Sequence, residues 1–102
     1  MNHPFNLAEA IQYQEGSVVS KEILNKSTGT ITLFAFDKGQ GLSEHKTPFE
    51  ALVYIIDGKA EIILSDTHHI LKNGDAIVFP QNAIHALKAI EKFKMLLIMI
   101  RS

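Results

Sequence analysis

Two histidines, His45 and His85, are the residues of this chain best suited to chemistry, because each follows a glycine turn and a short run of strand-forming residues. The upstream segment begins at Gly39 and the downstream segment at Gly74. Neutral imidazole binds zinc, nickel, manganese, iron and copper, so two histidines brought together predict a divalent transition metal site without selecting the metal. The alternative is a metal-free pocket in which both rings form hydrogen bonds to a ligand or to water.

The composition is that of one ordinary globular domain. The chain has 102 residues, of which 46% are hydrophobic and 21% charged, and its formal net charge is -1. We therefore expect a single domain over residues 1–102, without the basic surface that nucleic acid or an anionic membrane would require. Cysteine is absent, which excludes disulfides and thiolate metal ligands. No apolar run is long enough to span a bilayer, and we expect a cytoplasmic protein.

After Gly16 the chain has the pattern of β-strands separated by turns. Runs rich in β-branched, aromatic and aliphatic residues alternate with turn residues, and Asp57-Gly58 fits a two-residue hairpin turn. The one expected helix is a short N-terminal segment over 6–12, with Asn6 as its cap. This pattern predicts an all-β antiparallel sandwich or barrel. The expected strands are 18–24, 30–36, 52–56, 60–64, 76–79, 86–89 and 93–100.

The expected last strand is apolar on both of its faces, whereas a monomeric barrel with a solvated outer surface needs only one apolar face. The surplus on the outer face predicts that a second subunit covers it, so we expect a homodimer. The face assigned to the barrel interior carries Phe93, Met95, Leu97 and Met99, and the outer face carries Leu96, Ile98 and Ile100.

The glycines and histidines resemble the two motifs of the cupin superfamily, G-x5-H-x-H-x(3,4)-E-x6-G and G-x5-P-x-G-x2-H-x3-N. The resemblance implies a jelly-roll barrel, also called a double-stranded β-helix, over about residues 17–100. Asn82 and Ala89 stand where the second motif has its later glycine and its asparagine. The matching residues are Gly39, His45 and Gly58 in the first motif and Gly74, Pro80 and His85 in the second.

In that family three histidines and a glutamate typically hold a divalent metal inside the barrel, and this chain departs from that set. Thr47 stands where the second histidine is expected, and Ala51 stands at the glutamate position. Glu50 lies one residue too early, so it would face the interior only if a bulge re-aimed it. The resemblance therefore implies a reduced or absent metal site, with His45 and His85 as candidate ligands and Glu50 as a weaker one.

The barrel is expected to enclose a small pocket around the two imidazoles. Because no arginine or lysine is predicted inside, the pocket suits a small, mostly apolar or carbonyl-bearing organic molecule. Binding of such a ligand is the expected function, and the alternative is a metal-dependent dioxygenase, isomerase or decarboxylase with His45 and His85 as metal ligands. Of the adjacent His68 and His69, at most one can face the interior, and parity favours His69. The expected lining is His45, Thr47, Ala51, Val53, His85, Leu87, Met95 and Leu97.

Overall fold

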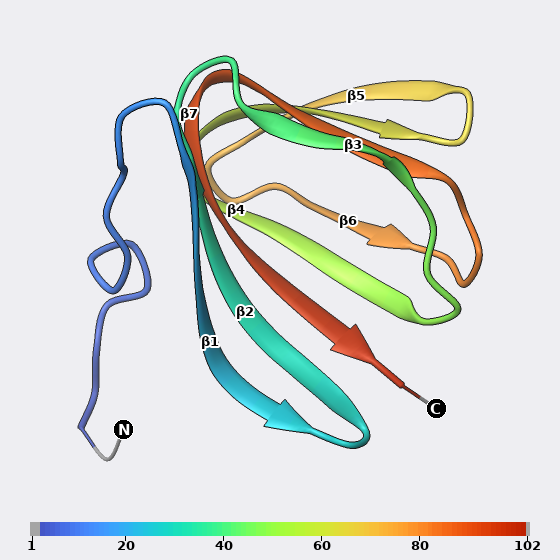
Figure 1. Ribbon diagram of the computed structural model, residues 1–102, viewed down its shortest axis with the longest axis horizontal. Coiled ribbons are helices and arrows are strands. Elements are labelled where there is room, and N and C mark those ends of the chain that lie inside the picture. The colour runs from blue at the N-terminus through green and yellow to red at the C-terminus, as the bar shows by residue number, and fades with distance from the viewer. Residues whose placement is uncertain (1–2, 102) are drawn as a thin grey trace.

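The computed structural model describes residues 3–101 and is built from β-strands joined by turns and loops (Figure 1). All strand pairs are antiparallel. Within residues 3–101 there is no helix that could cross a membrane. The strands are β1 (Val18–Lys26), β2 (Gly29–Phe36), β3 (Gly41–His45), β4 (Glu50–Leu64), β5 (Thr67–Lys72), β6 (Ala76–Phe79) and β7 (His85–Ile100).

The long strands β4 and β7 form the frame of the barrel, because they pair with each other from one end to the other. The first part of β4 also pairs with β6, and the last part of β7 pairs with β2, which in turn pairs with β1. The second part of β4 pairs with β5, and the first part of β7 pairs with β3. Two layers result, joined at one side and open at the other, where β3 ends and β7 begins (Figure 1).

Gly58 lies at the bend where β4 passes from one layer to the other. The expected hairpin turn at Asp57-Gly58 is wrong, because β4 is continuous through both residues. Gly58 has a φ of 86°, and the register with β7 shifts on both sides of it. A β-bulge uses the same positive φ as a hairpin turn, which is why the sequence signal fits both structures.

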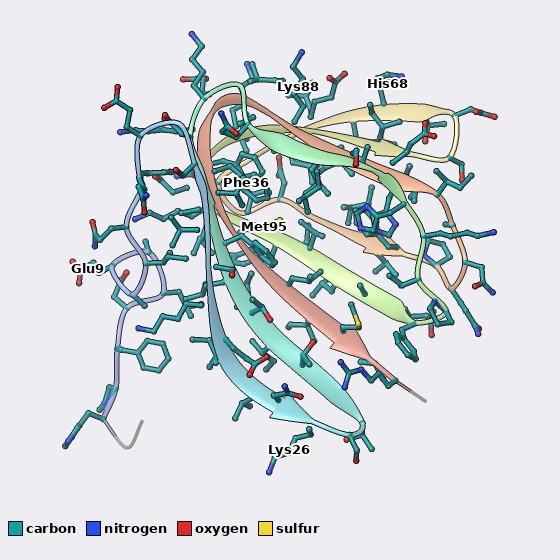
Figure 2. All side chains as sticks on the ribbon, in the orientation of Figure 1. Glu9, Lys26, Phe36, His68, Lys88 and Met95 are labelled. Atoms are coloured by element: carbon teal, nitrogen blue, oxygen red, sulfur yellow. The ribbon has the colours of Figure 1, made fainter. Side chains whose placement is uncertain are left out.

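The space between the two layers is filled by apolar side chains that alternate along the strands. The rings of Phe36 and Phe93 stack with centroids 4.4 Å apart, and both side chains are fully buried. Figure 2 shows Phe36 and Met95 between the layers, with Lys26 and Lys88 at the periphery. The buried cluster consists of Phe36, Ala51, Val53, Ile55, Ala60, Ile62, Phe79, Leu87, Ala89, Phe93 and Met95.

The N-terminal segment 6–12 forms only turns, so the expected short helix is wrong. Asn6 does act as a cap, because its side-chain oxygen accepts a hydrogen bond of 3.1 Å from the backbone nitrogen of Glu9. A helix of this length does not offset its nucleation cost without help from packing. The segment instead packs on the outer face of the layer that contains β2. The second buried cluster consists of Ile11, Leu33 and Ala35, flanked by Leu7, Ala10, Tyr13, Val19, Ile23, Ile56 and Leu96.

Lys94 and Asp57 hold this N-terminal segment against the sheet. The Lys94 side chain is buried, its Nζ donates a 2.5 Å hydrogen bond to the carbonyl oxygen of Ala8, and it lies 4.9 Å from the centroid of the Tyr13 ring. The Tyr13 hydroxyl donates a 2.5 Å hydrogen bond to Asp57. Burial and the Asp57 carboxylate raise the pKa of Tyr13 far above its ordinary value, so Tyr13 remains a hydrogen-bond donor at neutral pH.

Asp37 holds the end of the same segment, just before β1. Its carboxylate accepts hydrogen bonds from the backbone nitrogens of Gly16 at 2.7 Å and Lys38 at 2.9 Å. These bonds favour the charged form and lower the pKa of Asp37 below its ordinary value of 3.8. A carboxyl with a lowered folded-state pKa stabilises the protein above its unfolded-state pKa, and this contribution is lost as the pH falls through the folded-state value.

We expect Asp37→Asn to lower the thermal unfolding midpoint at neutral pH, because the neutral amide accepts backbone hydrogen bonds more weakly than the carboxylate does. The difference from wild type should shrink below about pH 4, where the unfolded-state carboxyl is protonated. Melting curves followed by circular dichroism over a pH series measure both effects. A difference that is independent of pH would show that the charge of Asp37 is not responsible.

Candidate functional site

His45 and His85 meet at the open end of the barrel. His45 ends β3, His85 begins β7, and the two residues are direct partners across the strand pair. Their Nε2 atoms are 3.0 Å apart, and their ring planes are inclined by 69°. The structure therefore joins the two histidines that the sequence places far apart in the chain.

A bulge in β3 brings His45 opposite His85. Leu42 pairs with Leu87, and the register then shifts before the next pair, so that three steps along β3 match two steps along β7. In a regular ladder Glu44 would stand opposite His85, and His45 would point to the other face. The sequence offers no signal for this bulge, although the site depends on it.

Backbone carbonyl oxygens fix the orientation of both rings. The Nδ1 atom of His45 lies 2.8 Å from the carbonyl oxygen of Ser43, and Nδ1 of His85 lies 3.1 Å from that of Ala83. A carbonyl oxygen can only accept, so this network assigns the proton to Nδ1 in each neutral ring. Both Nε2 lone pairs then face each other. Such an arrangement is favourable only when a cation, either a proton or a metal ion, lies between the two nitrogens.

The two rings have different surroundings. His85 is only 6% exposed and stacks on Phe79, with ring centroids 4.3 Å apart, whereas His45 is exposed at the mouth. Burial lowers the pKa of His85 below its ordinary value of 6.5, and the nearby His45 lowers it further. The hydrogen bond to the carbonyl oxygen of Ala83 has the opposite effect and is outweighed. His85 therefore favours the neutral form, which is the form that binds a metal ion.

A cavity of about 50 Å³ lies directly behind the histidine pair. Ligand pockets for drug-sized molecules begin at about 300 Å³, so in this conformation the cavity accepts a few waters or a ligand of a few atoms. Met95 and Met99 give it a deformable wall. The lining includes all eight expected residues, namely His45, Thr47, Ala51, Val53, His85, Leu87, Met95 and Leu97, and also Leu42, Phe79 and Met99.

Phe79 is the most informative residue that the sequence reasoning missed. It stands directly opposite Ala51 across the β4–β6 pair, so both residues share the inner face. Its position just before Pro80 is visible in the sequence, but its contact with His85 depends on the pairing of β6, which the sequence does not specify.

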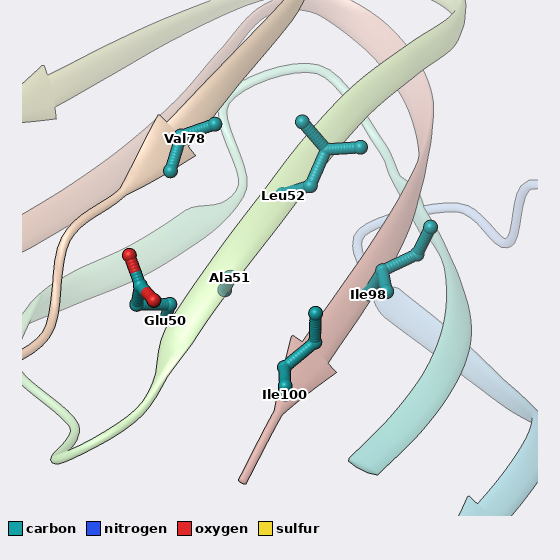
Figure 3. Close-up of a pocket in the computed structure, with 6 residues that line it drawn as sticks. All are labelled: Glu50, Ala51, Leu52, Val78, Ile98 and Ile100. Atoms are coloured by element: carbon teal, nitrogen blue, oxygen red, sulfur yellow. The ribbon is translucent and has the colours of Figure 1, made fainter. Parts of the chain in front are cut away.

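Glu50, the third candidate metal ligand, is not brought to the histidines. It lies on the outer face of β4 and lines a groove there, as Figure 3 shows. No bulge re-aims it, because Glu50 and Ala51 pair in regular register with Ile100 and Met99. Within residues 3–101 no cluster of three or more histidine, aspartate or glutamate side chains could hold a metal.

Two other polar residues near the interior also lie apart from the pair. Thr47 lines the cavity, and its hydroxyl donates a 3.2 Å hydrogen bond to the carbonyl oxygen of Phe49. His69 stands opposite the buried Ile62, so it is on the inner face of β5 as parity suggests, and its Nε2 lies 2.9 Å from the Thr67 hydroxyl. Neither residue adds a ligand to His45 and His85.

Asn82 preserves the loop geometry at a position where the family motif has glycine. Its φ is 65°, a left-handed conformation that asparagine tolerates better than most residues. Its backbone nitrogen donates a 2.8 Å hydrogen bond to the carbonyl oxygen of Thr47. This bond ties the loop before His85 to the loop after His45, which keeps the two rings together.

The donor geometry fits a transition metal ion. Metal to nitrogen bonds are about 2.0 to 2.1 Å long, so two Nε2 atoms that are 3.0 Å apart are close enough to bind the same metal ion. The carbonyl partners on Nδ1 are the outer hydrogen bonds that metal-binding histidines usually have. Two protein ligands leave the remaining positions to water or to a small molecule.

A two-layer antiparallel barrel with inward-facing histidines at its open end is the architecture of the cupins. The family model of the cupin domain matches residues 32–101, and the chain belongs to this family. No curated protein matches the chain.

Solved structures agree with this assignment. A conserved protein of unknown function from Streptococcus pyogenes has a TM-score of 0.95 and 30% identity, covering 100% of this chain and 90% of that one. A cupin superfamily protein from Desulfitobacterium hafniense has the same TM-score and identity, with coverage of 100% and 94%. A cupin 2 conserved barrel domain protein from Leptotrichia buccalis is 42% identical, with a TM-score of 0.91 over 95% of this chain and 47% of that one. The predicted cupin fold is confirmed.

Proposed function

We propose that this protein binds a small, mostly apolar organic ligand in the barrel, next to a reduced metal site formed by His45 and His85. The approach of the two Nε2 atoms to 3.0 Å carries the proposal, because the carbonyl partners on Nδ1 leave both Nε2 lone pairs available to one metal ion. Zinc, nickel, manganese, iron and copper all accept imidazole ligands, and the donor set does not select among them. The metal ion would supply Lewis acidity toward an oxygen atom of the ligand.

The shape and chemistry of the cavity define the ligand class. Apart from the two imidazoles and Thr47, its lining is apolar, and it contains no lysine or arginine. A phosphate or polyanion would lack the cationic partner that it needs. The volume of about 50 Å³ suits a molecule of a few atoms, and displacement of Met95 or Met99 would admit a larger one. Nucleic acid and membranes are not proposed as partners, because the net charge is -1.

A metal-dependent enzyme of the dioxygenase, isomerase or decarboxylase type is the second candidate. It is favoured by the small number of protein ligands and by the place of both histidines in the cavity lining, because a metal ion held by two imidazoles would have positions left for a substrate oxygen. In that case His45 and His85 would hold the metal ion, and the apolar wall would exclude bulk water. Recovery of a bound molecule unchanged after prolonged incubation supports binding alone, whereas conversion that His85→Ala abolishes supports the enzyme.

Metal content tests the proposal directly. We expect about one metal ion per chain in protein that has been stripped, reloaded with Co²⁺ or Zn²⁺ and desalted, and less than about a tenth of that in His45→Ala and in His85→Ala, because a single imidazole holds a divalent ion weakly. Elemental analysis by plasma mass spectrometry gives the stoichiometry. The visible spectrum of the Co²⁺ form reports the coordination number independently.

His68→Ala is the matched control. His68 is an exposed histidine on β5 whose Nδ1 lies 3.0 Å from Glu61, and it has no contact with the cavity. We expect its metal content to equal that of wild type. Equal metal content in His45→Ala, His85→Ala and wild type would refute the metal site and leave a metal-free pocket.

A further inference from the structure

We propose that Met99 adds a thioether ligand to the two imidazoles, which makes the candidate metal site selective for Cu⁺. This inference rests on the proposed function, because it requires that His45 and His85 hold a metal ion. It goes further by assigning a third ligand and by selecting the metal. Two imidazoles alone do not distinguish among transition metals, whereas thioether sulfur is a soft ligand that favours Cu⁺.

Met99 lies at the same depth in the barrel as the histidine pair. It is the direct partner of Ala51 between β7 and β4, and Ala51 is in turn the direct partner of Phe79 between β4 and β6. These three residues therefore form one row across the inner face of the layer. Phe79, at one end of the row, stacks on His85. Met99, at the other end, lines the same cavity as both histidines.

The small side chain of Ala51 leaves space for Met99 to reach the histidines. Ala51 stands where the family motif has its glutamate, and it contributes only a methyl group to the row. Met99 is half-buried, and a methionine side chain has three rotatable bonds that let it adapt to irregular space. The position that would supply a hard carboxylate oxygen in the family motif is thus replaced by a soft sulfur on the neighbouring strand.

The charge of the cavity lining also favours a monovalent ion. Within residues 3–101, no aspartate or glutamate lines the cavity, and the Thr47 hydroxyl already donates a hydrogen bond to the carbonyl oxygen of Phe49. Neutral imidazole and thioether ligands leave the charge of a bound ion uncompensated. The cost of taking an ion out of water rises with the square of its charge, so this cost is lower for Cu⁺ than for Zn²⁺ or Co²⁺.

Competition with the chelator bicinchoninate under anaerobic, reducing conditions measures the affinity for Cu⁺. We expect Met99→Leu to raise the Cu⁺ dissociation constant about tenfold. The affinity of this variant for Co²⁺ should equal that of wild type, because Co²⁺ gains little from a thioether ligand. Leucine nearly conserves the volume of methionine, so Met99→Leu should keep the circular dichroism spectrum of wild type.

Met95→Leu is the matched control, because it makes the same change on the same face of the same strand. Met95 also lines the cavity, but it lies four residues earlier in β7, which places its Cα atom about 13 Å farther from the open end. It pairs with Ile55, and Figure 2 shows it toward the side where the two layers are joined. We expect Met95→Leu to bind Cu⁺ as tightly as wild type.

X-ray absorption at the copper edge identifies the ligand atoms directly. We expect sulfur among the atoms bound to Cu⁺ in wild type and in Met95→Leu, and only lighter atoms in Met99→Leu. Equal Cu⁺ affinity in Met99→Leu and wild type, copper without a sulfur ligand in wild type, or tighter binding of Co²⁺ than of Cu⁺ would each overturn this inference and leave the histidine site intact. Retention of neither ion by wild type would instead refute the metal site itself.

Discussion

Gly58→Ala is expected to lower the free energy of unfolding by about 4 kcal/mol or more, a large part of the stability of a domain of this size. Gly58 has a φ of 86°, which a residue with a β-carbon adopts only at a cost. A β-carbon here would also fall well inside contact distance of the Lys92 carbonyl oxygen and of the Phe93 backbone. Both are main-chain groups of β7, so relief requires the two frame strands to separate. Guanidinium unfolding curves measure the loss.

Gly39→Ala separates the two causes of this effect. Gly39 has nearly the same φ, 85°, but nothing lies within 4 Å of the position that a β-carbon would take. We expect Gly39→Ala to cost only the conformational penalty of about 1 to 2 kcal/mol. If the two variants were equally destabilised, the close approach of β4 and β7 at Gly58 would not be the source of the additional loss.

Phe93→Ala is expected to lower the free energy of unfolding by about 3 to 5 kcal/mol, the range measured for large aromatic residues in protein cores. The Phe93 side chain is fully buried and stacks on Phe36 with an interplanar angle of 8°, so its removal leaves a cavity at the bend between the layers. Backbone pairing with Gly58 holds its position fixed, which limits collapse around the cavity.

Phe5→Ala provides the comparison for Phe93→Ala. Phe5 is 45% exposed in the N-terminal segment and belongs to neither buried cluster. Its removal should change the free energy of unfolding by less than about 1 kcal/mol. Chemical denaturation of both variants under the same conditions gives the contrast, and a loss below about 2 kcal/mol for Phe93→Ala would contradict the role assigned to the stacked pair.

The sequence was sufficient to predict the strands whose side chains alternate between the core and the outside. In 93–100 the alternation correctly assigns Phe93 and Met95 to the interior, because both are buried there. The two motifs also place their histidines in one site. Local information is enough in these cases, since side-chain alternation and turn chemistry are properties of short segments.

Features that depend on the partner strand could not be predicted. The Asp57-Gly58 pair fits a hairpin and a bulge equally well. The bulge forms because β7 is long enough to pair with β4 on both sides of these residues. The bulge that turns His45 inward has no sequence signature. The parity of His68 and His69 suggests an extended segment, but β5, Thr67–Lys72, is absent from the expected strands, because its residues are mostly polar and its place in the sheet comes from pairing with β4.

The N-terminal segment shows a different limit. Its spacing of Leu7, Ala10 and Ile11 fits one face of a helix, but it also fits packing against the outer face of the sheet. The tertiary contacts determine the outcome, because a segment this short has little intrinsic helix stability. Glu50 was a candidate ligand only through a bulge, and the regular register of β4 with β7 places it outside the barrel.

The anchoring of both imidazoles by main-chain carbonyls has a consequence for how this site tolerates mutation. Every amino acid supplies the same carbonyl oxygen, so changes of residue type at Ser43 or Ala83 leave the acceptors in place. The hydrogen bonds that orient His45 and His85 are therefore set by the path of the chain and not by the residue types at positions 43 and 83. Sequences around such a pair can diverge widely while the directions of the two lone pairs persist.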